Sequence, residues 1–476
     1  MTRREFIALD GGWGWLIVCG AGLSSMFIVP VSQVFSMIYG NKFEELGISA
    51  TEMSIIMNVN QAFGMILALA NVPLLRNYGY RKIAVIGQLL YSSGIILTSF
   101  ATCFIHFIIT YGMITSLGST MSFSANMLAV NTYFNEKRGQ AVGVYMLVAG
   151  LGQIFVPHVI SLILSIYNSE GTMLILGGMT LNHIIGALLL HPIEWHAKRV
   201  NNAENKSESI KTIGDDANIN HQMRKLSILG LRSEDVKKSS APRAKNKFLL
   251  MGMIQQVAMI LDLELLRDTV YMTTFTCLSF VLFVELNFNV LMPLILDELR
   301  FDMNSIATML SVLGIADLVF RGLAPYIGEW LRQPPMAMLF FSLVINLISR
   351  MALIFTQTYV ATLIVSISLG VAKGFRIVYM NILISTSAPL EKFAAASSIQ
   401  NLGNGCIMLI ASPVLGLIKD IAGSYILCII FLNIITLLIL IMLLGLFATK
   451  YIKNRKKLNT FYELEHVCKK CDFNCQ

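Results

Sequence analysis

The feature that most constrains this chain is the recurrence of long apolar runs along nearly its whole length. A helix needs about 20 consecutive, mostly apolar residues to cross the roughly 30 Å hydrocarbon core of a bilayer. Inside lipid, the backbone N–H and C=O groups must be hydrogen-bonded within the protein, so a chain of this kind folds into helices. Only 13% of the residues are charged, against about 25% in an average soluble domain. The sequence therefore predicts an all-α, polytopic membrane protein.

The apolar runs fall into two sets of six, separated by a polar stretch near the middle of the chain. The first set lies near residues 13–38, 51–75, 83–103, 105–131, 139–163 and 171–192. The second set lies near residues 269–296, 304–330, 335–356, 359–387, 393–418 and 424–448. The sequence thus predicts 12 transmembrane helices in two six-helix bundles. This plan resembles the major facilitator fold, in which the substrate binds near the membrane midplane between the bundles.

The predicted domain boundaries follow from these runs. They are an N-terminal bundle over residues 1–193, a linker over 194–268, a C-terminal bundle over 269–448 and a tail over 449–476. The linker is rich in Ser, Asn, Lys and Asp, which is typical of a mobile tether, although residues 248–266 suit an amphipathic helix on the membrane surface. Two pairs of small residues would let helices approach closely, an effect that ordinary membrane-helix packing explains equally well: Gly139 with Gly143, and Gly370 with Gly374.

Basic residues mark one side of the membrane in this topology. The linker and the tail lie on that side, together with the cations of the shorter connections: Arg3, Arg4, Arg76, Arg81, Lys82, Lys137 and Arg138. Cytoplasmic loops of membrane proteins carry an excess of Lys and Arg. We therefore expect both termini and the linker to be cytoplasmic.

Several classes of function are disfavoured by the sequence. The net charge of +8 comes from cations that lie between the apolar runs and in the tail rather than beside stacking aromatic residues, so we expect no nucleic-acid partner. No nucleophile elbow, zinc-binding helix motif or phosphate-binding loop is found, so we expect neither an enzyme nor a cofactor. The tail residues His466, Cys468, Cys471 and Cys475 form one short cluster. A single cluster is a weak zinc signal, and cysteine acylation explains it equally well, so no metal site is predicted.

Two charged residues near the middle of the eighth predicted span are candidates for substrate binding. A charge at the bilayer centre costs about 2.5–3.5 kcal/mol, so it needs a partner or a function. Asp317 and Arg321 are four residues apart and share one helix face, where they can neutralise each other. Arg321 could instead hold a carboxylate, while Asp317 accepts a proton or releases the arginine when the substrate arrives. A permanent ion pair remains the structural alternative.

The tenth predicted span carries two more cations, Lys373 and Arg376, with no acid nearby in sequence. Two unpaired cations on one helix face suggest an anionic ligand. Glu285 in the seventh predicted span is the most obvious counter-charge for both, and pairing is its expected role, with proton acceptance as the alternative. Arg350 lies nearer a helix end and is expected to extend its charged group toward the membrane surface.

Two segments of the chain resemble the signatures of the monocarboxylate transporter family of solute carriers. The first opens the first predicted helix and comprises Asp10, Gly11, Gly12, Trp13, Gly14 and Trp15. The second precedes the fifth predicted helix and comprises Tyr133, Phe134, Lys137, Arg138 and Gly143, with Glu136 in place of one usual cation. The resemblance covers the membrane region but neither the linker nor the tail.

The resemblance carries its own expectations for the site. Asp317 and Arg321 look like the family's acid and arginine of the eighth helix, which are implicated in proton and anion handling. Proton-coupled members carry a lysine late in the first helix, where this chain has Gln33. An uncharged Gln33 puts proton coupling in doubt, and Lys373 is a candidate for supplying the missing cation. The family also implies the plasma membrane as location, and it allows protons and a single-span accessory glycoprotein as partners.

The function predicted from these residues is transport of small monocarboxylate-type organic anions by alternating access. Two alternatives stay open at this point. One is a carrier of another small organic solute, such as an aromatic amino acid or a zwitterion. The other is a membrane sensor or scaffold that does not transport and whose linker and tail bind cytosolic partners.

Overall fold

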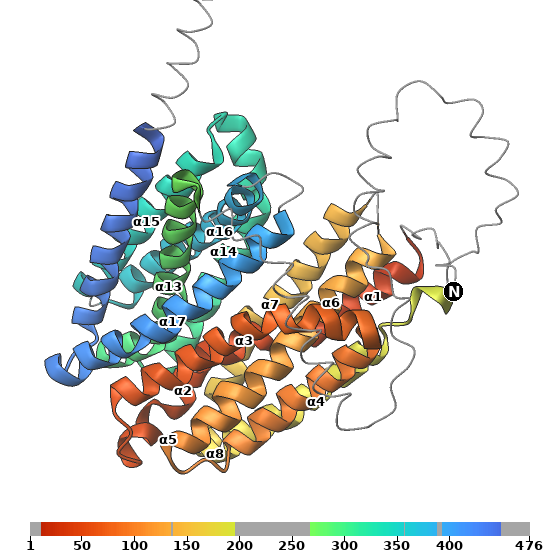
Figure 1. Cartoon of the computed structure of the whole chain (residues 1–476). Helices are drawn as coiled ribbons and strands as arrows, with labels where there is room; N and C mark the ends of the chain where they lie inside the picture. Colours follow the sequence, from red (N-terminus) through yellow and green to blue (C-terminus); the bar gives the residue numbers. More distant parts are fainter. Residues whose placement is uncertain (1–10, 135–136, 196–266, 357, 388–392, 449–476) are drawn as a thin grey trace, which may run out of the picture.

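The computed structural model describes residues 11–134, 137–195, 267–356, 358–387 and 393–448. Within these ranges the secondary structure is helical and contains no β-strand. Figure 1 shows two helical bundles, coloured red to yellow in the N-terminal half and green to blue in the C-terminal half. The prediction of an all-α fold in two bundles is confirmed, while the linker, the tail, Asp10 and the expected amphipathic helix at 248–266 lie outside the described residues.

The N-terminal bundle consists of six membrane-crossing segments, three of which are interrupted. Their helices are α1 (Trp13–Ser25), α2 (Ile28–Glu45), α3 (Ala50–Tyr78), α4 (Tyr80–Thr98), α5 (Phe104–Phe107), a π-helical stretch (Ile108–Thr115), α6 (Ser116–Tyr133), α7 (Arg138–Ile166), α8 (Ser169–Leu181) and α9 (His183–Leu188). The pairs α1–α2 and α8–α9 each form one interrupted span, as do α5, the π-helical stretch and α6 together. A short 3-10 turn over Ile193–Trp195 follows α9.

The C-terminal bundle consists of six long helices within the described ranges. They are α13 (Thr269–Glu298), α14 (Met303–Leu331), α15 (Pro335–Phe355), α16 (Tyr359–Ser387), α17 (Phe393–Ala422) and a final helix over Ile426–Ala448. In the described part of the chain, 11 helical segments are long and apolar enough to cross a membrane. The twelfth segment is α4, which is less apolar because its first turn contains Arg81 and Lys82. It packs against α6 and α8. Twelve spans in two bundles agree with the prediction.

Some helix boundaries differ from the predicted ones for local reasons. The third span was expected from residue 83, yet α4 begins at Tyr80, one residue after the end of α3. Gly79 makes this turn alone, because its φ of +80° is a conformation that glycine adopts without steric cost. The first span was expected to end near residue 38 but continues to Glu45, and Gly47 follows it with a φ of +66°.

The interruption between α1 and α2 has an identifiable cause. Pro30 has no N–H group, so the carbonyl of Met26 loses its usual α-helical donor. Gly152 of α7 packs onto that carbonyl so closely that a Cβ atom there would lie 1.8 Å from the Met26 oxygen. Next to the break, the ring of Phe27 lies 4.7 Å from the ring of His183, where α9 begins. Two interrupted spans therefore meet inside the N-terminal bundle.

In the described residues, the two bundles touch mainly through α3 with α17, α7 with α14, and α2 with α13. We call the end of the molecule that holds Glu45 and Glu298 the turn end, and the end that holds Trp13 and Leu331 the loop end. From the turn end, contacts run as far as Gly150 of α7, where a Cβ atom would lie 2.7 Å from the Leu318 side chain. Nearer the loop end, α7 and the C-terminal bundle diverge (Figure 1).

The two predicted pairs of small residues behave differently. A Cβ atom added at Gly139 or Gly143 would meet no described atom within 4 Å. Gly370 and Gly374 of α16, in contrast, lie against the backbone of α14, where added Cβ atoms would come within 2.4 Å of the Leu313 oxygen and 2.7 Å of the Asp317 oxygen. Only the second pair makes a close helix contact in this conformation.

Candidate functional site

The residues of the two signatures meet at the loop end and pack against each other. The ring of Trp15 lies 5.0 Å from that of Phe134, and a Cβ atom at Gly14 would be 2.9 Å from the same ring. Trp13 stacks on His191 at 5.1 Å, and the Tyr133 hydroxyl donates a 2.9 Å hydrogen bond to the His191 carbonyl. Side chains thus fill the contact between the start of α1, the end of α6 and the segment after α9, which indicates a structural role for the signatures.

The remaining signature residues are placed as follows. Gly11 and Gly12 immediately precede α1, and Gly12 has a φ of +55°. Lys137 is the N-cap residue of α7, and Arg138 is the first residue of that helix.

The first charged centre of the C-terminal bundle is built around Asp317 of α14. An Arg321 nitrogen, Nη2, lies 2.7 Å from Asp317 Oδ2, so the predicted i, i+4 ion pair is present. Lys373 Nζ of α16 lies 3.7 Å from the same oxygen. The close approach of α16 to α14 through Gly370 and Gly374 brings this lysine within reach.

A residue of the N-terminal bundle completes this centre. Lys373 Nζ donates a hydrogen bond of 3.4 Å to Oε1 of Gln153 on α7. Gln153 also packs against Gly314 of α14, where an added Cβ atom would lie 3.2 Å from the Gln153 Cβ. We call Asp317, Arg321, Lys373 and Gln153 the contact cluster, because it lies where the two bundles meet. Gln153 was not predicted as a site residue, although a glutamine inside the apolar run Leu151–Pro157 was a visible signal.

A second charged centre lies within the C-terminal bundle, around Glu285 of α13. Arg376 Nη1 contacts Glu285 Oε2, Arg350 Nη2 lies 3.8 Å from the same oxygen, and Asn289 donates a 3.0 Å hydrogen bond to Oε1. We call Glu285, Arg350 and Arg376 the inner cluster. Glu285 pairs with Arg376 as predicted, whereas Lys373 takes Asp317 rather than Glu285 as its acid. The premise of two unpaired cations on α16 is therefore wrong, because each cation has an acid on another helix.

Arg350 corrects a further prediction. Its side chain is 1% exposed and does not extend toward the membrane surface. The guanidinium carbon lies 4.5 Å from the ring centroid of Phe288, and Nη1 donates a 3.4 Å hydrogen bond to Thr436 Oγ1. Position along the helix suggested a surface charge, but the Glu285 carboxylate and the Phe288 ring stabilise the guanidinium inside the bundle.

The two clusters hold more cations than acids. Their members are Arg321, Arg350, Lys373 and Arg376 on one side and Asp317 and Glu285 on the other. Several buried polar atoms of these residues have no hydrogen-bond partner among the described residues: Asp317 Oδ1, Arg321 Nε, Arg350 Nε and Arg376 Nη2. With every group in its ordinary ionised state, the interior of the C-terminal bundle carries a surplus of positive charge. Because uncompensated charge is costly in a low-dielectric interior, this interior favours an anion.

Gln33 lies on α2 and is half-buried. No hydrogen bond from its side chain to a described residue is found. One turn further along, Ser36 donates a 2.8 Å hydrogen bond to the carbonyl of Val290 in the C-terminal bundle. The structure thus places Gln33 on a helix that contacts the other bundle, but it does not join Gln33 to either charged cluster.

The turn end holds the two bundles together with a carboxylate that caps a helix. Asp420 at the end of α17 accepts hydrogen bonds from the backbone N–H groups of Ala50 at 2.9 Å and Thr51 at 3.0 Å, and from the Thr51 hydroxyl. These are unpaired N–H groups at the positive end of the α3 dipole, where an anion is favourable. Gly416, one turn earlier on α17, lies on the Thr51 backbone without room for a side chain.

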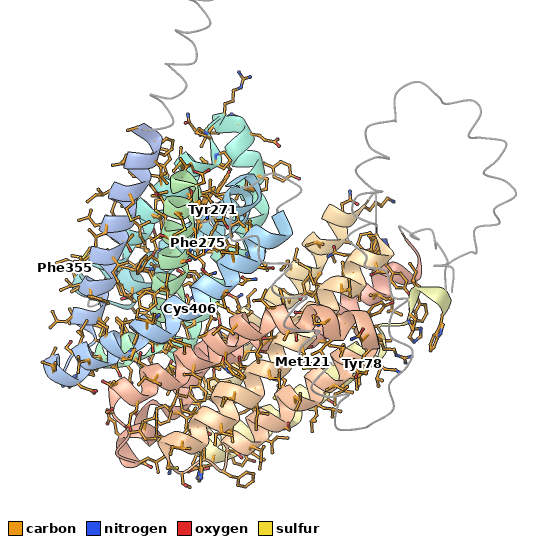
Figure 2. The ribbon with its side chains drawn as sticks, in the orientation of Figure 1. Tyr78, Met121, Tyr271, Phe275, Phe355 and Cys406 are labelled. Carbon is orange, nitrogen blue, oxygen red and sulfur yellow. The ribbon has the colours of Figure 1, made fainter. Side chains whose placement is uncertain are left out.

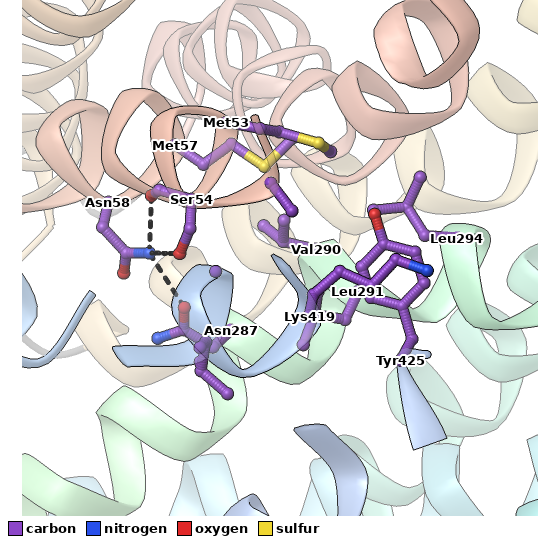
Figure 3. A pocket seen from close by; sticks show the side chains of 13 residues that line it. Met53, Ser54, Met57, Asn58, Asn287, Val290, Leu291, Leu294, Lys419 and Tyr425 are labelled. Atoms are coloured by element: carbon purple, nitrogen blue, oxygen red, sulfur yellow. Dashed lines mark hydrogen bonds between the residues drawn. The ribbon is translucent and has the colours of Figure 1, made fainter. Parts of the chain in front are cut away.

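Neutral hydrogen bonds continue this contact toward the bundle interior (Figure 3). Asn58 Nδ2 donates to Asn287 Oδ1 at 2.8 Å, and Ser54 donates to the Ser412 carbonyl at 2.8 Å. The cavity beside these residues, lined also by Met53 and by side chains of α13 and α17, is about 20 Å³. That volume holds roughly one water molecule, so the two bundles are in close contact at this end.

No group of three or more His, Cys, Asp or Glu residues that could hold a metal ion occurs in the described ranges. The tail cluster of His466, Cys468, Cys471 and Cys475 lies outside them.

Comparison with known protein families places the chain. The profile of the Major Facilitator Superfamily matches residues 14–413. Monocarboxylate transporter 1 of Rattus norvegicus is 28% identical over 443 residues, covering 87% of this chain and 81% of the rat protein. Monocarboxylate transporter 12 of Mus musculus is 23% identical over 436 residues, covering 89% of this chain and 84% of the mouse protein. The predicted resemblance to monocarboxylate transporters is confirmed.

Solved structures share the same architecture. A POT family transporter in complex with a thioalcohol-conjugated peptide superposes with a TM-score of 0.64 at 15% identity, covering 92% of this chain and 99% of that chain. The nucleoside transporter NupG gives a TM-score of 0.66 at 11% identity, covering 91% and 100%. These relatives and neighbours are transporters and not enzymes, as predicted for this chain. Because the family profile extends over most of the sequence, the chain belongs to the major facilitator superfamily.

Proposed function

We propose that this protein carries small monocarboxylate-type organic anions across the plasma membrane by alternating access to the contact cluster. The observation that carries the proposal is the surplus of buried cations, one group of which extends to the contact between the bundles through Lys373 and Gln153. Substrates of this superfamily bind between the two bundles near the membrane midplane. An anion bound there would balance the charge of the contact cluster.

Arg321 is the residue that first meets the substrate in this mechanism. Its side chain is 21% exposed, compared with 1% for Asp317 and 7% for Lys373, so it has the most open approach. A carboxylate accepts two parallel hydrogen bonds from a guanidinium and a further one from an ammonium group. Asp317 then stays paired with one of the two cations, while the other cation pairs with the substrate carboxylate. The loaded cluster has no net charge, which lowers the cost of moving the bundles around it.

The proposed orientation has the loop end in the cytoplasm together with the N-terminus, the linker and the tail. The excess of Lys and Arg in the connections of that end supports it. The closed turn end then faces outward, and the described conformation is one that admits solute from the cytoplasm. Opening the turn end while closing the loop end completes the transport cycle.

Proton coupling is not part of the proposed cycle. Gln33 has a neutral amide where proton-coupled relatives of the predicted family carry a lysine. Lys373 supplies a cation from the tenth span instead, and it already has a carboxylate partner in Asp317. Flux should therefore follow the gradient of the anion. The single-span accessory glycoprotein expected from the resemblance would aid delivery to the surface and would not be needed for flux.

The proposal is tested with purified protein in liposomes and a panel of radiolabelled solutes. The panel contains monocarboxylates from acetate to benzoate together with aromatic amino acids, at external pH 6 and 7.5. We expect saturable uptake of monocarboxylates that changes little with pH and falls at least tenfold in Lys373→Gln. Uptake of the amino acids alone would support the zwitterion carrier, and absence of any flux would support the sensor or scaffold. Uptake that is much faster at external pH 6 than at pH 7.5 would show that transport is coupled to protons, against this part of the proposal.

A further inference from the structure

Gln153 is the place where the N-terminal bundle, whose described buried polar groups are uncharged, touches the charged interior of the other bundle. Within the described residues, its Oε1 accepts the side-chain hydrogen bond by which Lys373 of the C-terminal bundle reaches the N-terminal bundle. The side chain lies deep in the contact between α7 and α14, with 6% of Gln153 exposed. Gly314 leaves room for Gln153 at this position, because a Cβ atom at Gly314 would lie 3.2 Å from both the Cβ and the backbone oxygen of Gln153.

The orientation of the Gln153 amide follows from its partner. An ammonium group only donates hydrogen bonds, so the carbonyl oxygen of the amide must face Lys373. The Nε2 group consequently points away from that contact. It has no hydrogen bond to a described residue, yet it is absent from the fully buried polar atoms that lack a partner. It therefore keeps accessible surface and two free N–H donors on the side chain that contacts Lys373.

An anion held by Lys373 would lie next to the Gln153 amide, because these two side chains are in contact. The Lys373 ammonium has three N–H groups, of which one faces Asp317 and one faces Gln153, leaving the third for a substrate oxygen. We infer that Gln153 is a substrate-binding, specificity-determining residue whose Nε2 donates a hydrogen bond to the carboxylate held by Lys373 and Arg321. This inference rests on the proposed function, since it assigns the N-terminal bundle's contact with the same anion.

The contact has a consequence for transport. A ligand can favour closure of two bundles around itself only if it interacts with both. Lys373, Arg321 and Asp317 all belong to the C-terminal bundle. The anion therefore needs a hydrogen-bond donor from the N-terminal bundle to stabilise the closed conformation. A neutral amide supplies that donor without adding charge to a span whose apolar surroundings would penalise it.

The inference is tested with Gln153→Leu and Gln153→Glu in the liposome assay, using the monocarboxylate that wild type takes up fastest. Leucine keeps the bulk but removes the donor, and we expect KM to rise about 5–10-fold while kcat changes less than twofold. Glutamate places an acid beside Lys373 that competes with the anion, so uptake should fall more than tenfold. Gln140→Leu, an exposed change at the start of the same helix, is the matched control and should behave as wild type.

A second readout separates the inference from the proposed function. Bound anion should raise the melting temperature of the detergent-solubilised wild type, and less so that of Gln153→Leu at equal concentration. If wild type transports and is stabilised by the anion while Gln153→Leu has the same KM and the same stabilisation, the inference is overturned and the proposed function stands. If wild type shows neither flux nor stabilisation by any monocarboxylate, both are overturned. If Gln153→Leu melts lower without anion but binds it normally, the residue is structural and the inference is rejected.

Discussion

The two bundles solve the problem of a polar interior in different ways. In the described residues, the buried carboxylates, guanidinium and ammonium groups all belong to the C-terminal bundle: Glu285, Asp317, Arg350, Lys373 and Arg376. The N-terminal bundle buries neutral groups instead, as where Asn126 Nδ2 donates to Ser24 Oγ at 2.6 Å and to Ser25 Oγ at 3.0 Å. The interior of the C-terminal bundle thus contains charged groups, whereas the interior of the N-terminal bundle contains neutral polar groups.

The same division holds where the bundles meet. Lys373 approaches the neutral Gln153, and Asp420 approaches the N–H groups of Ala50 and Thr51. Among the described residues, no ion pair joins the two bundles. Opposite charges in a low-dielectric contact attract strongly and are costly to separate. The contact of a charged group with a dipole is weaker than an ion pair. Such a contact suits two bundles that must separate and come together in each transport cycle.

Breaking the charge balance inside the C-terminal bundle should have the largest effect. Glu285→Gln leaves Arg376 and Arg350 without an acid while keeping the shape of the side chain. Removing one partner of a buried ion pair costs about 3–5 kcal/mol, so the folded yield and the melting temperature should drop sharply. Thermal unfolding of the solubilised protein measures this. Asp297→Asn, an exposed change on the same helix, is the control and should leave the melting temperature unchanged.

Asp317→Asn should affect transport more than stability. The change leaves Lys373 and Arg321 without their shared carboxylate, but both can turn toward water or a bound anion, because they lie at the contact between the bundles. We expect tighter anion binding together with at least a tenfold lower turnover, since the loaded site no longer becomes neutral and releases its anion slowly. Uptake kinetics in liposomes provide the measurement. An unchanged turnover would show that Asp317 has no part in exchanging the substrate.

Sequence reasoning reached the fold and the local part of the site. The pair of Asp317 and Arg321 was predictable because an i, i+4 spacing fixes a shared helix face whatever the tertiary structure. The partner of Lys373 was not, because it depends on how closely α16 approaches α14 through Gly370 and Gly374. Arg350 was misjudged for the same reason, since burial depends on packing against Glu285 from another helix.

The helix interruptions and the contacts between the two bundles could not be predicted from the sequence either. Pro30 indicates that a helical hydrogen bond is missing in the first span. The close approach of Gly152 to the Met26 carbonyl, however, is a tertiary feature. The sequence did not indicate a role for Gln153 or Asp420, because their roles depend on which surface of the opposite bundle they meet. Contacts between the bundles carry no period in the sequence, unlike the helices themselves.

Asp420→Ala should shift the balance between the two ends of the carrier. The substitution removes the carboxylate that caps α3 from the other bundle. Loss of a capping side chain costs about 0.5–2 kcal/mol, so the turn end should open about twofold to about 30-fold more often. Labelling of Met57→Cys by an impermeant thiol reagent, in a chain whose eight native cysteines are replaced by serine, reports this opening.

Asp302→Ala is the matched control for that change. Asp302 caps α14 through Ser305 within its own bundle, and hydrogen bonds from the Ser305 side chain and backbone hold the pKa of its carboxyl below the ordinary value. Its removal should lower stability but leave the labelling of Met57→Cys unchanged. Equal labelling in both variants would mean that Asp420 has no specific effect on the turn end.

Asn58→Ala provides the smallest expected effect and the sharpest test of the charge-to-dipole contrast. The Asn58 amide donates to Asn287 across the same contact, but neither partner is charged. Hydrogen bonds between membrane helices contribute about 0.6 kcal/mol on average, which corresponds to roughly a threefold change in an equilibrium. Labelling of Met57→Cys should therefore rise by less in Asn58→Ala than in Asp420→Ala. If the neutral pair proves as strong as the capped helix, the charge of Asp420 contributes nothing to closure, and the shape of the two surfaces alone holds the turn end together.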